Sequence, residues 1–287
     1  MKKRTTLQQL DHMNAQRAVY TIDKLRFIKS ITSIEGCIGT GKSTFLDHMI
    51  EWARNQGRDA QTITCDSPTG DYYLFVGEPV GPWTDPIYHT GHYGDDSIQE
   101  GQPILEMYYD DPKNVAFPFQ IFAFTTRICA IRDALSGVDI VGRIVSGEIR
   151  IHVVCERSLY TDALFMYCQY LLRNVNAMQL EVYTKLHSTT CDALLAIHTG
   201  MVYVQTPLDI CAVRIKERNR VGEKAVSIPY QTILEQRHDI MADDFERVSD
   251  THRVYRIDAR RQMTHGELAV VVHDLMMRID RDIARLQ

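Results

Sequence analysis

The chain has 287 residues, of which 45% are hydrophobic and 24% charged, a composition typical of a globular protein that buries a sizeable core. Its formal net charge of −5, without a long run of one sign, disfavours sequence-independent binding to nucleic acid or to an anionic membrane. The seven cysteines are scattered and never spaced C-x-x-C, which argues against a disulfide framework or a zinc knuckle. Reduced thiols in a cytoplasmic compartment are therefore expected.

The N-terminal segment, residues 1–28, is basic at its start and is predicted to be an extension that is frayed or partly helical. No apolar segment follows Arg4 before Asp11, so a secretory signal is not expected, and an organelle transit peptide would be richer in Arg and Ser. No uninterrupted apolar run reaches the ~18 residues that a membrane-spanning helix needs. The sequence therefore predicts no membrane segment.

Five short runs rich in β-branched residues recur along the rest of the chain, separated by longer segments with apolar residues three and four apart. The predicted strands are residues 30–35, 72–76, 150–155, 201–204 and 253–257, and the predicted helices are residues 43–55, 119–135, 160–188 and 265–285. Residues 85–102 and 136–148 lack periodicity and are predicted to be loops, the first long enough to act as a lid or binding element. This alternation predicts an α/β fold with a parallel sheet, and because no linker or repeat divides residues 29–287, we expect one domain there.

A glycine-rich loop connects the first predicted strand to the first predicted helix. It reads Gly36-Cys37-Ile38-Gly39-Thr40-Gly41-Lys42-Ser43-Thr44 and matches the phosphate-binding pattern G-x-x-x-x-G-K-[ST]. Glycines let the backbone curl so that successive N–H groups point at phosphate oxygens, while Lys42 reaches the β- and γ-phosphates and Ser43 can ligate Mg²⁺. Because a strand and a helix flank the loop, the sequence predicts a nucleoside triphosphate site rather than a chance glycine-rich turn.

The loop alone leaves a kinase, a GTPase and a motor ATPase open. The chain has no Asn-Lys-x-Asp motif for guanine, and no hydrophobic strand ends in the Asp of an ordinary Walker B motif. Instead, the strand predicted at 150–155 leads into Glu156-Arg157-Ser158, and a carboxylate at that edge of a parallel sheet can hold Mg²⁺ directly or through water. A solvated ion pair is the ordinary alternative for Glu156 and Arg157. We expect Ser43 and Glu156 to form a magnesium site.

Four further features follow the order found in one family. They are Glu78-Pro79-Val80 with Trp83, Leu105-Glu-Met-Tyr-Tyr109 followed by Phe119-Gln120, Glu156-Arg157-Ser158, and Arg214-x-x-x-Arg218-x-Arg220. With the loop, these motifs make the chain resemble the deoxynucleoside kinases over roughly residues 30–258. The resemblance implies a P-loop NTPase-type three-layer fold, in which helices flank a parallel five-stranded sheet and an arginine-rich helical lid covers the site. It also implies transfer of the γ-phosphate of ATP, with Mg²⁺, to the 5′-hydroxyl of a deoxynucleoside in nucleotide salvage.

The resemblance assigns catalytic roles to three residues. Glu78 matches the general base that accepts the proton of the attacking hydroxyl, while Lys42 and Arg157 match residues that stabilise charge on the phosphates. The lid arginines expected to fold over the phosphates are Arg214, Arg218 and Arg220. Taken alone, Glu-Pro would be an ordinary loop corner and the arginines a solvated helix face, but their order among the other motifs favours the functional interpretation.

The nucleoside pocket is also assigned by resemblance. Besides Glu78 and Arg157, it is expected to contain Ile38, Trp83, Tyr108, Tyr109, Phe119, Gln120, Ala123, Arg127, Asp162 and Glu223. Gln120 matches the residue that pairs with the nucleobase, and Tyr109 and Glu223 match those that bind the sugar 3′-hydroxyl. A homodimer formed by helix packing is implied as well, and we expect its interface in residues 119–135 and 160–188.

Two positions concern the choice of base. Arg127 lies seven residues after Gln120, and Asp162 lies four after Ser158. In the family, this Arg–Asp pair together with a small residue at the position of Ala123 accompanies deoxycytidine and purine deoxynucleoside substrates, whereas thymidine-preferring members have apolar residues at the paired positions. The sequence therefore favours cytosine or purine deoxynucleosides over thymidine, with an ordinary interhelix ion pair as the alternative.

Two other functions remain as alternatives. A nucleoside monophosphate kinase would share the fold and the P-loop, but it would need further basic groups for the acceptor phosphate, where this chain has Glu78. A nonenzymatic nucleotide-binding subunit would have no reason to keep the base, the metal ligand and the lid arginines together.

Overall fold

The computed structural model describes residues 25, 27–90, 98–138, 141–220, 223 and 226–286. Its centre is a parallel five-stranded sheet with the strand order β2-β5-β1-β6-β7. The strands are β1 (Ile28–Glu35), β2 (Gly70–Val76), β5 (Ile149–Glu156), β6 (His198–Gln205) and β7 (Arg253–Asp258). All five strands predicted from the sequence are confirmed, as is the α/β fold class.

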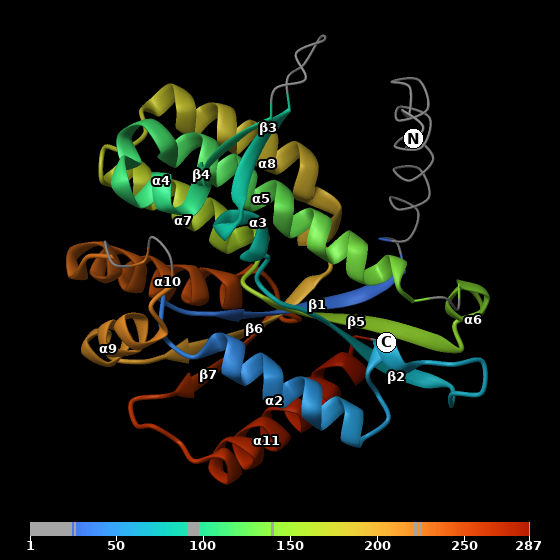
Figure 1. Cartoon of the computed structure of the whole chain (residues 1–287). Coiled ribbons are helices and arrows are strands. Elements are labelled where there is room, and N and C mark those ends of the chain that lie inside the picture. The colour runs from blue at the N-terminus through green and yellow to red at the C-terminus, as the bar shows by residue number, and fades with distance from the viewer. Residues whose placement is uncertain are drawn as a thin grey trace.

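Helices cover both faces of this sheet, so the molecule has three layers (Figure 1). Side chains alternate between the faces along β2: Leu74 joins a core cluster with α5 (Pro112–Ser136) and α7 (Leu159–Leu171), whereas Tyr73 and Phe75 face α2 and α11. The two helices of that second face are α2 (Lys42–Asn55) and α11 (His265–Ala284). The sheet is therefore buried on both sides, and even the polar residues Ser30, Thr32 and Ser33 of β1 are buried in it.

Several helices begin or end where side chains cap them rather than where the apolar period starts or stops. α5 begins at Pro112, seven residues before the predicted start, because Asp111 accepts a hydrogen bond from the N–H of Asn114. The helix predicted at 160–188 is wrong as a single element. α7 ends at Leu171 and α8 (Ala177–Leu195) begins after Asn176, which forms a capping box with Gln179.

The two predicted loops are both partly structured, so those predictions are wrong in part. Within 85–102, β3 (Pro86–Thr90) pairs antiparallel with β4 (Ile98–Pro103), and residues 91–97 lie outside the described residues. Within 136–148, α6 (Val141–Val145) forms a short helix, and residues 139 and 140 are not described. A two-stranded hairpin and a single helical turn are held mainly by backbone hydrogen bonds, so neither needs the apolar periodicity that was used to predict strands and helices.

Four short elements and one long helix complete the described part of the chain. They are a 3₁₀ turn at Ala60–Thr62, α3 (Gly81–Thr84), α4 (Ile104–Asp110), α9 (Leu208–Arg218) and α10 (Ile228–Val248). The periodicity did not single out α10. The predicted N-terminal extension lies outside the described residues except for its end, and its boundary at 28 falls on the first residue of β1, so the division into extension and domain stays a prediction.

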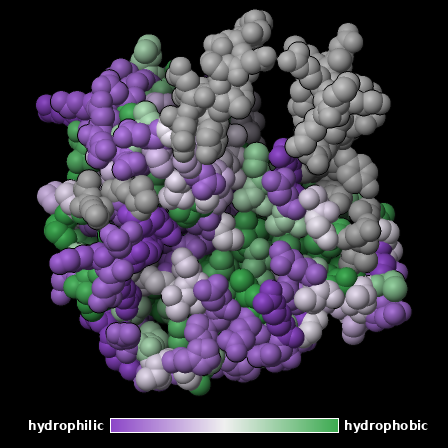
Figure 2. Space-filling model, viewed as in Figure 1, coloured by the Kyte–Doolittle hydropathy of each residue, from purple (hydrophilic) through white to green (hydrophobic). Residues whose placement is uncertain are grey.

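Much of the surface over α2 and α11 is hydrophilic in Figure 2, as expected for amphipathic helices packed on a sheet. Among the described residues, one helix, α5, is long and apolar enough by length and composition to cross a membrane. Core helices meet the same criterion, and Phe124 and Ile131 of α5 are buried in the main core cluster. The sequence analysis predicted no membrane segment because no uninterrupted apolar run is long enough. α5 meets the criterion of overall length and composition, as core helices also do.

Candidate active site

A cavity opens at the carboxyl ends of β1, β2 and β5, where the P-loop, Glu78 and Glu156 follow their strands. The space inside it, with the open mouth included, is about 650 Å³. All twelve residues predicted to bind the nucleoside line it, namely Ile38, Glu78, Trp83, Tyr108, Tyr109, Phe119, Gln120, Ala123, Arg127, Arg157, Asp162 and Glu223. Gly39, Lys42, Glu156, Arg218 and Arg220 line it as well.

The P-loop lies between β1 and α2, as predicted. Gly39 and Gly41 have φ angles of 87° and 96°, the left-handed region that favours glycine. A Cβ on Gly39 would also lie 2.7 Å from the carbonyl oxygen of Cys211, so only glycine fits there. Gly36, Thr40, Gly41, Ser43 and Thr44 complete the loop and the start of α2 without lining the cavity.

Lys42 is buried at the end of the P-loop and donates to the carbonyl oxygens of Gly36 at 3.2 Å and Cys37 at 2.7 Å. Burial, helped by the positive charge of Arg157, lowers the pKa of Lys42 to about 8. Burial therefore leaves the ammonium group short of nearby negative charge, which phosphate oxygens would supply. Ser43 donates from Oγ to Oε1 of Glu156 at 3.1 Å, so the two predicted metal ligands are adjacent.

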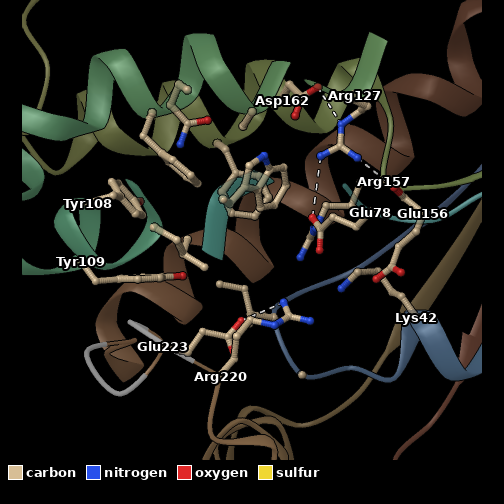
Figure 3. A pocket seen from close by; sticks show the side chains of 18 of the residues that line it. Lys42, Glu78, Tyr108, Tyr109, Arg127, Glu156, Arg157, Asp162, Arg220 and Glu223 are labelled. Atoms are coloured by element: carbon tan, nitrogen blue, oxygen red, sulfur yellow. Dashed lines mark hydrogen bonds and ion pairs between the residues drawn. The ribbon is translucent and has the colours of Figure 1, made fainter. Parts of the chain in front are cut away.

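Glu78 follows β2 and is held by two arginines. Nε of Arg157 lies 2.9 Å from Oε1 of Glu78, and NH2 of Arg127 lies 3.7 Å from the same oxygen. Burial alone would raise the pKa of Glu78, but the charges of Arg157 and Arg127 outweigh it and lower the pKa below its ordinary 4.5. The carboxylate is therefore ionised at neutral pH and oriented in the cavity, as the labelled side chains in Figure 3 show.

Arg157 is fixed from three sides. Besides the ion pair with Glu78, its NH1 donates to the carbonyl oxygen of Gly36 at 3.0 Å, and its guanidinium lies 4.8 Å from the ring centre of Phe165. Its backbone adopts a φ of 63°, an uncommon conformation for a residue other than glycine. Arg157 thus connects Glu78 to Gly36, the first residue of the P-loop.

Arg127 and Asp162 form the predicted pair. Nε of Arg127 donates to Oδ2 of Asp162 at 2.8 Å, and its NH1 donates to the carbonyl oxygen of Glu156 at 2.9 Å. Both side chains are only 4% exposed, so water does not screen the interaction. Although burial opposes the charged form, Asp162 and Glu78 raise the pKa of Arg127 above its ordinary value, and Arg127 stays positive.

Aromatic side chains form the apolar wall of the cavity. The ring of Phe119 stacks on Tyr108 at 4.6 Å between centres and meets the edge of Trp83 at 5.8 Å. Trp83 is held by a hydrogen bond from Nε1 to Oγ1 of Thr126 at 2.9 Å. Gln120 is 2% exposed and lies inside α5 rather than at a helix start, and its side-chain amide makes no hydrogen bond to another described residue. Its amide remains available to a ligand.

Two of the predicted lid arginines, Arg218 and Arg220, pair with Glu223, and all three residues line the cavity. Arg218 lies 2.6 Å and Arg220 3.2 Å from carboxylate oxygens of Glu223. Burial raises the pKa of the Tyr109 phenol well above its ordinary value, so it stays protonated and can donate a hydrogen bond. Arg214 does not line the cavity, and instead its NH1 donates to the carbonyl oxygen of Thr40 at 3.1 Å.

Sequence reasoning missed three residues of the cavity and one beside it. Leu105, Phe165 and Tyr230 line the cavity, and the Tyr230 hydroxyl lies 3.3 Å from that of Tyr108. Gln231 lies next to the P-loop without lining the cavity. Tyr230 and Gln231 belong to α10, whose polar and apolar residues are typical of any surface helix, so no local signal identified them.

A Ser–His–Asp arrangement lies elsewhere in the sheet and is not a second active site. His152 hydrogen-bonds Ser30 Oγ at 2.8 Å through Nδ1 and Asp71 Oδ1 at 2.9 Å through Nε2. Ser30 is 2% exposed, and neither it nor His152 lines the cavity described above. These hydrogen bonds satisfy polar groups buried between strands.

The family model for deoxynucleoside kinase matches residues 32–279. The chain belongs to the deoxynucleoside kinase family. It is 26% identical over 218 residues to the deoxycytidine kinase of Homo sapiens, covering 74% of each chain, and 25% identical over 218 residues to the thymidine kinase of Ictalurid herpesvirus 1, covering 75% of this chain and 76% of the relative. Its fold matches that of a deoxyadenosine kinase from M. mycoides with bound dCTP, with a TM-score of 0.57 and 18% identity, over 86% of this chain and 99% of that one.

Membership of the deoxynucleoside kinase family makes the chain a phosphotransferase that uses a nucleotide donor and phosphorylates deoxynucleosides. The relatives' names include different bases, so they do not decide which deoxynucleoside this kinase prefers.

Proposed function

We propose that this kinase transfers the γ-phosphate of ATP, with Mg²⁺, to the 5′-hydroxyl of deoxycytidine or a purine deoxynucleoside in preference to thymidine. The observation that carries the base preference is the buried pair of Arg127 and Asp162, which lines the cavity together with Gln120. Arg127 donates and Asp162 accepts, so the pair presents polar groups where an apolar pocket would suit the methyl group of thymine.

Glu78 is proposed to act as the general base. Its carboxylate is ionised at neutral pH and can accept the proton of the 5′-hydroxyl as the oxygen attacks the γ-phosphorus. The Arg157 ion pair keeps one carboxylate oxygen in place, leaving the other for the hydroxyl. Because the transition state of phosphoryl transfer is loose, positioning of the hydroxyl contributes more than the strength of the base.

Charge on the phosphates is proposed to be stabilised from two sides. Lys42 reaches the β- and γ-phosphates from the P-loop, while Arg157 and the lid arginines Arg214, Arg218 and Arg220 approach from other directions. The adjacent Ser43 hydroxyl and Glu156 carboxylate supply hard oxygen ligands of the kind that Mg²⁺ prefers, so the residues present fit the metal. Bound Mg²⁺ would neutralise phosphate charge there.

Phosphorylation of monophosphates is disfavoured by the pairing of the basic groups. Among the described arginines that line the cavity, Arg127 and Arg157 pair with Glu78 or Asp162, and Arg218 and Arg220 pair with Glu223. The phosphate that a nucleoside monophosphate already carries would lie near these carboxylates and be repelled. The pairing of Glu223 with the lid also supports a role near the sugar 3′-hydroxyl, next to Tyr109.

The proposed specificity is tested by an assay with Mg·ATP, the four deoxynucleosides and the matching monophosphates, with ADP and phosphorylated product both measured. We expect turnover with deoxycytidine or the purine deoxynucleosides and much less with thymidine or any monophosphate. Thymidine as the best acceptor would overturn the base preference, and turnover restricted to monophosphates would overturn the proposed acceptor class.

A homodimer is also proposed. Three apolar side chains spaced four residues apart on α8 are exposed in the monomer: Met178 by 71%, Val182 by 51% and Leu186 by 40%. A stripe of this kind on one helix face favours packing against a second copy of the chain. This location agrees with the α-helical interface expected from the sequence, while a cytoplasmic location and the absence of nucleic-acid partners remain proposals.

The dimer predicts a mass near twice 33.0 kDa in sedimentation velocity. Val182→Glu should shift the protein to a monomer, because a charge in the apolar stripe would be buried without a partner. Glu181→Gln, an exposed change at the neighbouring position, is the control and should leave the mass unchanged. A monomeric parent protein would contradict the proposal.

A further inference from the structure

The P-loop is held from outside by Gln231, at the start of α10. Nε2 of Gln231 donates to the carbonyl oxygen of Ile38 at 2.7 Å, and the N–H of Ile38 donates to Oε1 of Gln231 at 3.2 Å. Gln231 is 2% exposed, so both bonds form away from water. Only one orientation of the amide provides a donor and an acceptor in the right places, and one side chain therefore fixes both backbone groups of a loop residue.

Besides a hydrogen bond from Oγ1 of Thr40 to the carbonyl oxygen of Cys37, the side chains that bond to Gly36 and Cys37 are charged groups with proposed roles in the reaction. Lys42 donates to the carbonyls of Gly36 and Cys37, and Arg157 also donates to Gly36. When the donor binds, Lys42 has to reach the phosphates and exchange its bonds to the loop for bonds to phosphate oxygens. The amide of Gln231 is neutral and does not line the cavity, so that exchange does not require its two bonds to Ile38 to break.

The start of α10 also contacts the acceptor side of the cavity. Tyr230, the residue before Gln231, lines the cavity, and its hydroxyl lies 3.3 Å from that of Tyr108. Ile38 itself lines the same cavity. One end of one helix therefore touches both the loop that receives the donor phosphates and the wall of the nucleoside pocket.

We propose that Gln231 is a positioning residue for phosphoryl transfer, which holds Ile38 so that the P-loop and the acceptor pocket keep a fixed relative position. The proposal rests on the function proposed above. In-line transfer requires the attacking oxygen within about 3–3.5 Å of phosphorus, and a displacement of about 1 Å can lower the rate about 100-fold. Gln231 acts through the loop backbone and does not touch either substrate.

The test compares Gln231→Met with Gln236→Met in the full chain. Methionine is similar in size to glutamine but makes neither bond to Ile38, and Gln236 is an exposed residue five positions along the same helix. Steady-state constants for Mg·ATP and the best deoxynucleoside acceptor are measured below the Tm of each variant. Turnover by the parent enzyme is measured first, and it tests the proposed function independently of Gln231.

We expect Gln231→Met to lower kcat by about 10- to 100-fold and to raise the KM for ATP, with the KM for the deoxynucleoside within about threefold of the parent. Gln236→Met should match the parent. Gln231→Glu keeps an acceptor for the Ile38 N–H but places a second oxygen against the Ile38 carbonyl oxygen, so it should also lower kcat. If the Met variant does not fold, the kcat of the Glu variant tests the proposal. A folded variant at Gln231 with a lower Tm but kcat and the KM for ATP within about twofold of the parent would overturn the proposal, because a purely structural contact would behave in that way.

Discussion

Replacing Glu78 by Gln is expected to lower kcat by about 10²- to 10⁴-fold, the usual contribution of a positioned general base. Glutamine keeps the size of the side chain and an oxygen that can face Arg157, so the cavity should keep its shape. The amide cannot accept the proton of the 5′-hydroxyl, and the negative charge that lies between Arg157 and Arg127 is lost. Binding of ATP and of the deoxynucleoside should change by much less than kcat.

This result is measured by steady-state kinetics for kcat and by calorimetry or fluorescence for the two binding constants. Glu51→Gln, which removes an exposed carboxylate on α2, is the matched control and should leave kcat unchanged. A Glu78→Gln variant with the kcat of the parent would remove Glu78 as the base, and equal losses in kcat and in nucleoside affinity would assign it a binding role instead.

The second large effect is expected at the buried ion pair. Arg127→Met should lower the free energy of unfolding by about 3–5 kcal/mol, because it leaves the carboxylate of Asp162 buried without its partner. It also removes the bond from NH1 to the carbonyl oxygen of Glu156, at the end of β5. Combining Arg127→Met with Asp162→Ala removes both charges, so the double variant should recover much of the lost stability.

The double variant also tests the proposed choice of base. With apolar side chains at both positions, the cavity should accept thymidine better, so the ratio of kcat/KM for thymidine to that for deoxycytidine should rise by about 10-fold or more. Denaturant unfolding of the two single variants and the double variant measures the coupling free energy of the pair. An unchanged substrate ratio, with the expected stability changes, would make the pair purely structural.

Local patterns in the sequence were sufficient for much of the fold. The strands form short runs rich in β-branched residues, and the P-loop requires glycine where φ is positive, as at Gly39 and Gly41. Both patterns can be recognised from a few consecutive residues, without knowledge of how distant segments pack. Where an element is defined by a cap or by backbone pairing, as at Asp111 and in the hairpin β3–β4, apolar periodicity placed its limits wrongly or missed it.

The candidate site was also predicted only in part from the sequence. The residues that line the cavity were predicted by the resemblance to the deoxynucleoside kinases, because the motifs of that family occur here in the same order. The resemblance also paired Arg127 with Asp162, but it could not predict that Arg127 contacts Glu78 and the end of β5 as well, since these contacts depend on how α5 packs on the sheet. Tyr230 also came only from the packing of α10 against the rest of the site.

By itself, then, the sequence determined the α/β class, the phosphate-binding loop and the family, because each depends on residue types at short or ordered spacing. The tertiary structure alone decided that Glu78 pairs with Arg157, that Glu223 pairs with Arg218, and which groups hold the loop. The contact between Ile38 and Gln231 joins residues 193 positions apart, and nothing in either local sequence distinguishes it. Such contacts depend on the packing of whole helices, and their strength comes from the burial that only the folded chain provides.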